Sequence, residues 1–319
     1  MPSKYPVPPL DLSRLETYPL AARRSKVSRE QLGRAPEPGE SFRSFWERLP
    51  DVLAASNLRD LVSRMHKARE RGQALLWGIG AHVIKVGLSP VVIDLMNRGY
   101  VSGIALNGAG IIHDFEMAVA GQTSEEVAEV LGAGKFGMAE ETGAFLNDAI
   151  RRGVEDGMGL GESVSSFLTK NDPAHKEVSI LWNAYRLTVP VTVHVAVGTD
   201  IIHMHPQASG AAIGEGSLRD FRLFASLVRA LHGGGVYLNF GSAVILPEVF
   251  LKAVSVVRNL RFPLSDFSTA NFDFIRHYRP RVNVVERPVT GKGRGFDFVG
   301  HHELLLPLLA AALVETAEP

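Results

Sequence analysis

The sequence contains no cysteine among its 319 residues, which excludes disulfide bonds, thiolate metal sites and a cysteine nucleophile. It also lacks an excess of either charge, with 34 Lys and Arg against 34 Asp and Glu. A balanced chain has no bulk electrostatic attraction to nucleic acid or to an anionic membrane. No apolar run approaches the roughly 18 residues of a membrane-spanning helix, and the N-terminus lacks a signal-like apolar stretch. These absences favour a cytoplasmic protein whose partner is a small molecule.

The composition is that of a folded protein, with 45% hydrophobic and 21% charged residues. Residues 1–40 are rich in proline and charge and lack the apolar periodicity of a core-forming segment. We expect them to form an arm that either wraps a neighbouring subunit or stays mobile. No linker interrupts residues 41–319, so the rest of the chain is predicted to be a single domain.

Apolar strands alternate with amphipathic helices along that domain. Helical spacing of apolar residues begins at Ser41, and the glycine-flanked, β-branched segments that follow predict strands. Such alternation predicts a doubly wound α/β fold, with a mostly parallel Rossmann-like sheet covered by helices on both faces. The strands are expected at 73–80, 101–108, 189–198, 233–242, 282–288 and near Phe296. The helices are expected at 89–96, 116–131, 138–152, 173–186, 217–231, 247–257 and 303–314.

Polar residues and glycines collect just beyond the predicted strands. Ligands of doubly wound folds bind at this carboxyl edge of the sheet, so we expect these residues to meet at one rim. Six of the 11 histidines belong to the set. The candidate residues are Gly80, His82, Lys85, Asn107, Gly108, Ala109, Gly110, His113, Asp114, Asp200, His203, His205, Asn239, Gly241, Ser242, His301 and His302.

These residue types are compatible with several chemistries. Glycine turns such as GIGAHVIKVG and NGAGIIHD let the backbone approach a phosphate, although neither is a complete dinucleotide or P-loop fingerprint. A histidine beside Asp200 or Asp114 can serve as a general base near neutral pH. Lys85 can contact a phosphate, act as an amine nucleophile, or remain a solvated side chain.

A metal site is the alternative reading of the same histidines. His203 and His205 are separated by one residue, which is a spacing found among metal ligands. Together with His301 they predict, in this alternative, a metal-dependent hydrolase in which Asp200 manages the proton.

Several segments, in order, resemble the deoxyhypusine synthase family. GAHVIKVG resembles that family's turn after the first strand, and VPVTVHVAVGTD resembles its Ile-Pro-Val strand and Thr-Asp-Gly loop. GGGVYLNF falls where the family has Gly-Gly-Gly-Val-Pro followed by its catalytic lysine, and GHHELLLPLLAAALVE resembles its closing helix. The correspondence covers roughly residues 75–315 with weak identity.

The resemblance implies a Rossmann-like sheet that binds NAD, in a homotetramer with active sites between subunits. By position it places Asn107, Gly108, Ala109 and Gly110 on the cofactor, together with His82 and His301. We add Gly80, Gly241 and Ser242 to the predicted cofactor site. The resemblance places Asp200 or His203 at the substrate amine, and we predict His203, Asp200, His113 and Lys85 as the catalytic residues.

One departure from the family limits what the resemblance implies. Leu238 occupies the position of the nucleophilic lysine, and no lysine lies between Lys176 and Lys252. Deoxyhypusine synthesis itself is therefore not expected. Three hypotheses remain: an NAD-dependent enzyme acting on a small amine or alcohol, the metal-dependent hydrolase, and a catalytically silent nucleotide-binding or regulatory protein. The sequence does not distinguish NAD from NADP.

Overall fold

The computed structural model describes residues 4–317, and its centre is a six-stranded parallel sheet. The strand order is β3-β2-β1-β4-β5-β6, and every neighbouring pair is parallel. This is the order of the dinucleotide-binding Rossmann sheet, so the predicted fold class is confirmed. The strands are β1 (Leu75–Ile79), β2 (Gly103–Asn107), β3 (Val191–His194), β4 (Val236–Phe240), β5 (Ser268–Asp273) and β6 (Gly295–Val299).

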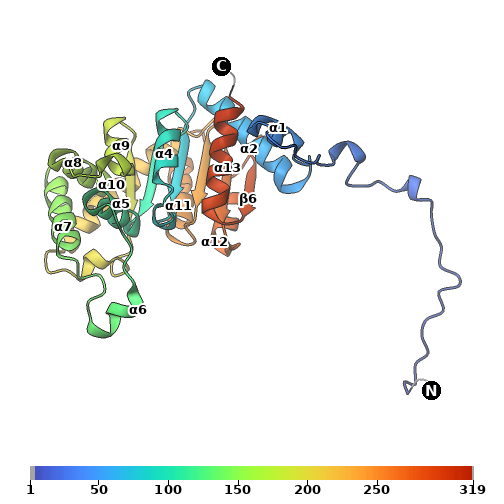
Figure 1. Cartoon of the computed structure of the whole chain (residues 1–319), viewed down its shortest axis with the longest axis horizontal. Coiled ribbons are helices and arrows are strands. Elements are labelled where there is room, and N and C mark those ends of the chain that lie inside the picture. Colours follow the sequence, from blue (N-terminus) through green and yellow to red (C-terminus); the bar gives the residue numbers. More distant parts are fainter. Residues whose placement is uncertain (1–3, 318–319) are drawn as a thin grey trace.

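Two apolar cores lie on the two faces of the sheet, because successive side chains of a strand point in opposite directions. Trp77 belongs to one core and its neighbour Leu76 to the other. The first core is covered by α2 (Leu53–Glu70), α4 (Ser89–Asn97), α5 (Gly108–Ala120) and α13 (His302–Glu315). The second is covered by α10 (Gly210–Arg229) and α11 (Ile245–Asn259). Figure 1 shows α4 and α13 in front of the sheet.

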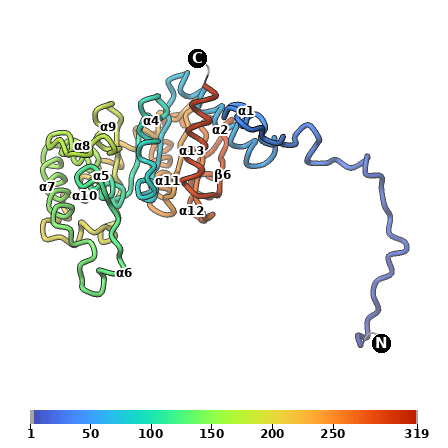
Figure 2. Tube along the Cα trace, in the orientation of Figure 1, coloured from blue at the N-terminus to red at the C-terminus, as the bar shows by residue number. Residues whose placement is uncertain are grey.

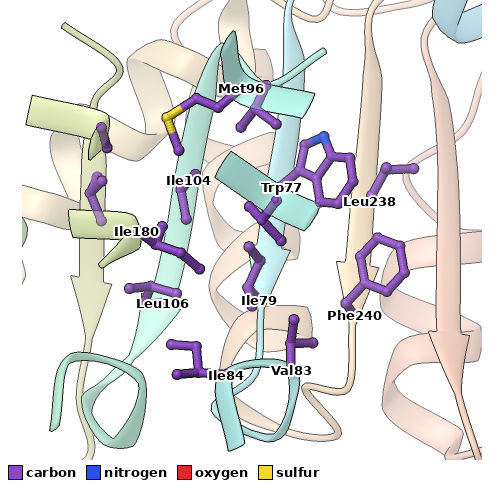
Figure 3. Packing of buried hydrophobic residues seen from close by; sticks show 14 of the residues in the cluster. Trp77, Ile79, Val83, Ile84, Met96, Ile104, Leu106, Ile180, Leu238 and Phe240 are labelled. Atoms are coloured by element: carbon purple, nitrogen blue, oxygen red, sulfur yellow. The ribbon is translucent and has the colours of Figure 1, made fainter. Parts of the chain in front are cut away.

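Aromatic side chains fix the register of the central strands. Trp77 stacks on Phe240 with ring centroids 5.1 Å apart, and its indole N–H donates to the carbonyl of Tyr100. Phe272 continues the stack from Phe240, at 4.4 Å. In Figure 3 the labelled side chains of β1, β2 and β4 lie side by side on neighbouring strands. Val83 of α3 (His82–Lys85) lies just beyond the strand ends. This packing brings the carboxyl ends of the strands to one rim.

Three further helices cover the β3 edge of the sheet: α7 (Glu140–Glu155), α8 (Leu160–Asn171) and α9 (Ile180–Arg186). The helix predicted over 173–186 was wrong in its first half, because residues 176–178 form a 3-10 turn and α9 begins only at Ile180. Asp114 sets that beginning: it accepts hydrogen bonds from the Ser179 hydroxyl at 2.5 Å and from the Ile180 N–H at 2.7 Å.

The predicted strand over 282–288 was also wrong. Residues Arg281–Glu286 form a π-helical turn, and the strand at this place in the sheet is β5. The valines of the turn suggested a strand, but Val284 is buried against the second core and its carbonyl accepts from Thr269 of β5. β5 was not predicted because its sequence is polar, although its backbone pairs with β4 and β6.

The helix predicted over 116–131 is divided. Helix α5 begins directly after β2 and ends at Ala120, where Gly121 has a positive φ of 69°. Residues 121–126 form a loop, followed by the short α6 (Val127–Val130). The remaining short helices are α1 (Phe42–Arg48) and α12 (Tyr278–Pro280). Within residues 4–317, no helix is both long enough and apolar enough to cross a membrane.

The N-terminal segment extends away from the body of the protein (Figure 2). Residues 4–30 are exposed throughout and contain only short 3-10 turns, at Leu20–Ala22 and from Arg29. The chain meets the body at Gln31, whose carbonyl accepts the N–H of Asp51, and again where the Arg34 N–H donates to the carbonyl of Arg48. That this arm wraps a second subunit stays a prediction, as does the domain boundary at residue 40.

Candidate functional site

Two glycines bring the carboxyl ends of β1 and β4 together. A Cβ on Gly80 would lie 2.5 Å from the carbonyl oxygen of Gly241, so only glycine permits this approach. Gly241 also has a φ of 65°, a left-handed conformation that glycine adopts without strain. Between β1 and β4 the strand order changes direction, and ligands of doubly wound sheets bind at this switch point.

A group of aromatic rings adjoins this switch point. The rings of His82 and His302 are 5.5 Å apart, and Phe274 lies 6.2 Å from both His301 and His302. His302 is 1% exposed, and its Nε2 lies 3.2 Å from the carbonyl oxygen of Phe272. The Nδ1 atom is buried without a partner among residues 4–317. Burial lowers the pKa of His302, which keeps the ring neutral at neutral pH.

The family resemblance predicted His301 as a cofactor-binding residue, but the residue buried at the switch point is its neighbour His302. His301 is exposed and stacks on Phe274, whereas His302 touches Gly241 at the switch point. Consecutive residues at the start of a helix face different directions, so only one of them can pack against the strand ends. Ser242, predicted to bind the cofactor, has a structural contact instead: its hydroxyl accepts the N–H of Leu246 in the first turn of α11.

A second group of predicted residues surrounds a cavity of about 220 Å³ beyond β2 and β3. Helix α3 contributes Lys85, α5 contributes Ala109 and His113, and the loop after β3 contributes Asp200. Glu116 of α5 also lines the cavity, one helical turn after His113. Because α3 carries His82 at its start and Lys85 at its end, it connects this cavity to the switch point.

Asp200 lies directly against the first turn of α5. A Cβ on Gly108 would lie 2.0 Å from its Oδ2 atom, and the backbone N–H of Ala109 donates a hydrogen bond to the carboxylate. Burial raises the pKa of Asp200, while the neighbouring His203 and this hydrogen bond lower it. The carboxylate thus occupies the helix end that a phosphate would use, and the side chain of Asn107 already caps Gly110.

His203 acts on Asp200 and is turned away from the cavity. Its Nδ1 atom accepts the N–H groups of Gly198 at 3.1 Å and of Asp200 at 3.3 Å. Its Nε2 atom lies 3.9 Å from Asp200 Oδ2, and both atoms are buried without a hydrogen-bond partner in the described part of the chain. The side chain is 5% exposed, so it orients Asp200 and does not reach a ligand in this conformation.

The three histidines of the alternative metal site are not brought together. His205 lies 2.8 Å through Nε2 from the carbonyl oxygen of Gly137 and packs against Gly143, while His301 lies at the start of α13. Across residues 4–317 there is no group of three or more His, Asp and Glu side chains that could hold a metal ion. Asp114, the other candidate acid, is buried as the cap of α9.

Comparisons with known proteins agree on the fold. No family model and no curated protein matches the sequence. Among solved structures, a putative LOR/SDH protein from Methanococcus maripaludis is 16% identical, with a TM-score of 0.51 over 82% of this chain and 69% of its own. AgrE in a ternary complex with ornithine and NAD+ is 14% identical, with a TM-score of 0.53 over 82% of this chain.

A putative deoxyhypusine synthase from Entamoeba histolytica is also among the neighbours, at 12% identity and a TM-score of 0.48 over 90% of this chain and 97% of its own. The present chain spans only 33% of the length of AgrE and of the arginine dihydrolase ArgZ from cyanobacteria. The chain has a Rossmann-like fold shared with an NAD+-binding protein. At these identities the likeness establishes the fold, and the chemistry has to come from the chain's own residues.

Proposed function

We propose that the chain is an NAD-dependent enzyme that oxidises a small amine or alcohol. The observation that carries this proposal is the cavity holding His113, Asp200 and Lys85, which α3 connects to the β1–β4 switch point of a Rossmann sheet. AgrE, which shares the fold, binds NAD+ and ornithine. A cofactor at the switch point and a substrate in the cavity would be neighbours.

The residues at the switch point fit a nucleotide. Gly80 and Gly241 let the backbones of the two strand ends meet closely, and His302 offers a buried Nδ1 atom without a partner in the described chain. We assign cofactor binding to Gly80, His82, Gly241 and His302. The α5 end from Asn107 to Gly110 is less suitable for phosphate, because the Asp200 carboxylate already lies there. When bound, the nicotinamide supplies the hydride acceptor.

The chain's own residues would orient the substrate and move its proton. His113 lines the cavity, and burial lowers its pKa, so the ring is neutral and able to accept a proton at neutral pH. Asp200 faces the same cavity and can bind the substrate's amine or hydroxyl group. Lys85, exposed at its rim, is suited to an anionic group of substrate or cofactor.

A covalent intermediate on β4 is not part of this proposal. Leu238 is fully buried in the middle of β4, at the position that the deoxyhypusine synthase resemblance assigns to the lysine nucleophile. Transfer of an alkyl group would therefore have to proceed directly from an imine to an acceptor amine, or through Lys85. The absence of a lysine on β4 equally supports the alternative of a catalytically silent nucleotide-binding protein.

Calorimetric titration of the pure protein with NAD+ and NADP+ tests the proposal. We expect saturable binding of one of them, and reduction of the bound cofactor when small amines, amino acids or alcohols are added. Binding without turnover would favour the silent protein. No binding at millimolar concentrations of either cofactor would contradict the proposal. The homotetramer implied by the family resemblance is a separate proposal, which light scattering tests.

A further inference from the structure

A chain of hydrogen bonds runs from the cavity histidine to a carboxylate and involves residues so far given no role. His113 Nδ1 lies 2.7 Å from the hydroxyl oxygen of Thr123, and that hydroxyl donates to Glu116 Oε2 at 2.5 Å. The other carboxylate oxygen of Glu116 accepts the hydroxyl of Thr142 at 3.0 Å. His113 and Glu116 lie three residues apart on α5, Thr123 lies on the following loop, and Thr142 lies on α7.

The donors in this chain determine where the histidine proton resides. An ionised carboxylate can only accept hydrogen bonds, so the single hydroxyl proton of Thr123 is committed to Glu116. The oxygen of Thr123 can then serve His113 only as an acceptor. Nδ1 of His113 must therefore carry the proton of the neutral ring, which leaves Nε2 with a free lone pair.

Because Nδ1 is bonded to Thr123, Nε2 is the ring nitrogen left for a ligand in the cavity. His113 lines the 220 Å³ cavity with Lys85 and Asp200, and its Nε2 atom has no hydrogen-bond partner within residues 4–317. A neighbouring cavity of about 540 Å³ is lined by Glu116, Thr123 and Thr142. The hydrogen-bonded chain thus forms part of the wall between the two cavities.

We propose that Thr123 and Glu116 are positioning residues that hold His113 as its Nδ1–H tautomer, so that Nε2 accepts the substrate's proton. The proton transfer rests on the proposed function, whereas the tautomer rests on the hydrogen bonds alone. In the oxidation, the C–H and N–H or O–H bonds of the substrate break and a C=N or C=O bond forms. With NAD+ bound, the hydride would pass to the cofactor and the proton to Nε2 of His113.

Nitrogen-15 NMR of the imidazole side chains tests the tautomer directly. In the wild-type protein above pH 7, we expect His113 to show a protonated Nδ1 and an unprotonated Nε2, with His113→Gln identifying its signals. Thr123→Val keeps the shape of the side chain and removes the hydroxyl, so it should mix the two tautomers. Thr123→Ser should restore the wild-type pattern. Thr169→Val, which removes a hydroxyl from α8, is the matched control and should leave the pattern unchanged.

The outcomes separate this inference from the proposed function, because the tautomer requires no cofactor. A protonated Nε2 on His113 of the wild type would overturn the inference, as would a Thr123→Val protein with an unchanged pattern. If Thr123→Val does not fold, the spectra of the wild type and of Thr123→Ser still show which nitrogen of His113 carries the proton. Where NAD-dependent turnover is found, Thr123→Val should lower kcat about tenfold with little change in KM, and Thr123→Ser should recover it. An unaffected kcat would limit the hydrogen-bonded chain to a structural role.

Discussion

Two clusters of buried polar side chains differ in their hydrogen bonding. On β4, β5 and β6 the amide of Asn239 donates to Asn271 at 2.8 Å, and the amide of Asn271 donates to Asp297 at 3.0 Å, while Asn239 Oδ1 and the Tyr237 hydroxyl are buried without a partner in the described chain. Beyond β2 and β3, in contrast, Asp200 Oδ2 and His203 Nε2 are buried within 3.9 Å of each other and bond nothing in the described chain. The paired amides link neighbouring strands, whereas the unpaired Asp200 and His203 atoms lie next to the cavity, where a buried polar group without a partner calls for an explanation.

Replacing the cavity histidine should have the largest effect. If His113 is the proton acceptor, His113→Gln should lower NAD-dependent turnover by about 10²- to 10⁴-fold, which is the usual contribution of general acid–base catalysis. His205→Gln is the matched control, because His205 bonds the carbonyl of Gly137 and faces away from the cavity. Steady-state kinetics of both variants measure the difference. Equal losses of turnover would show that the cavity does not carry the chemistry.

Two buried carboxylates should differ in their contribution to stability. Asp114 accepts one hydroxyl and two backbone N–H groups, so Asp114→Asn places an amide donor against those donors and should lower the free energy of unfolding by about 2–3 kcal/mol. Asp200→Asn should change it by less than about 1 kcal/mol, because one oxygen of Asp200 has no partner in the described chain. Urea unfolding measures both, and an Asp200→Asn loss as large as that of Asp114→Asn would contradict the comparison.

His194 on β3 gives the smallest predicted effect, a dependence of stability on pH. Burial lowers the pKa of His194 to about 3, so the unfolded chain takes up its proton first as the pH falls below about 6.5. His194 should therefore contribute a loss of stability on acidification of about 1.4 kcal/mol per pH unit.

His194→Leu should remove this component. Urea unfolding at pH 7, 6 and 5 measures it as the difference between wild type and variant. Asp114 and Asp220 oppose it, since burial raises the pKa of Asp114 to about 6 and of Asp220 to about 7, and their contribution is lost as the pH rises. This opposing contribution is present in both proteins and cancels in the difference. Parallel pH profiles for the two proteins would refute the assignment.

The apolar strands could be predicted from the sequence, whereas the polar strand β5 could not. β1, β2 and β4 were predicted because their buried residues are continuous, as in Leu75–Ile79. β5 was missed because Asn271 and Thr269 are acceptable in a core only when other strands and turns supply their partners. Those partners lie 15 to 32 residues away in the chain, where local patterns carry no information.

The sequence predicted the location of the site more accurately than the role of each residue in it. The histidine-bearing turns do gather at the carboxyl edge, but in two groups, around the β1–β4 switch point and around the cavity beyond β2 and β3. Which histidine is buried, His301 or His302, depends on how α13 begins, and no local pattern shows this. Glu116 could have been recognised from its position three residues after His113, whereas Thr123 on a loop gave no signal.

A crystal structure of the chain grown with NAD+ tests the central claim most directly. The account predicts that the cofactor lies in the crevice between β1 and β4, in contact with Gly80, Gly241 and His302, with its nicotinamide toward the cavity of His113. A cofactor bound instead across the start of α5, over Asn107 to Gly110, would contradict the assignment, as would crystals grown at saturating NAD+ that contain none.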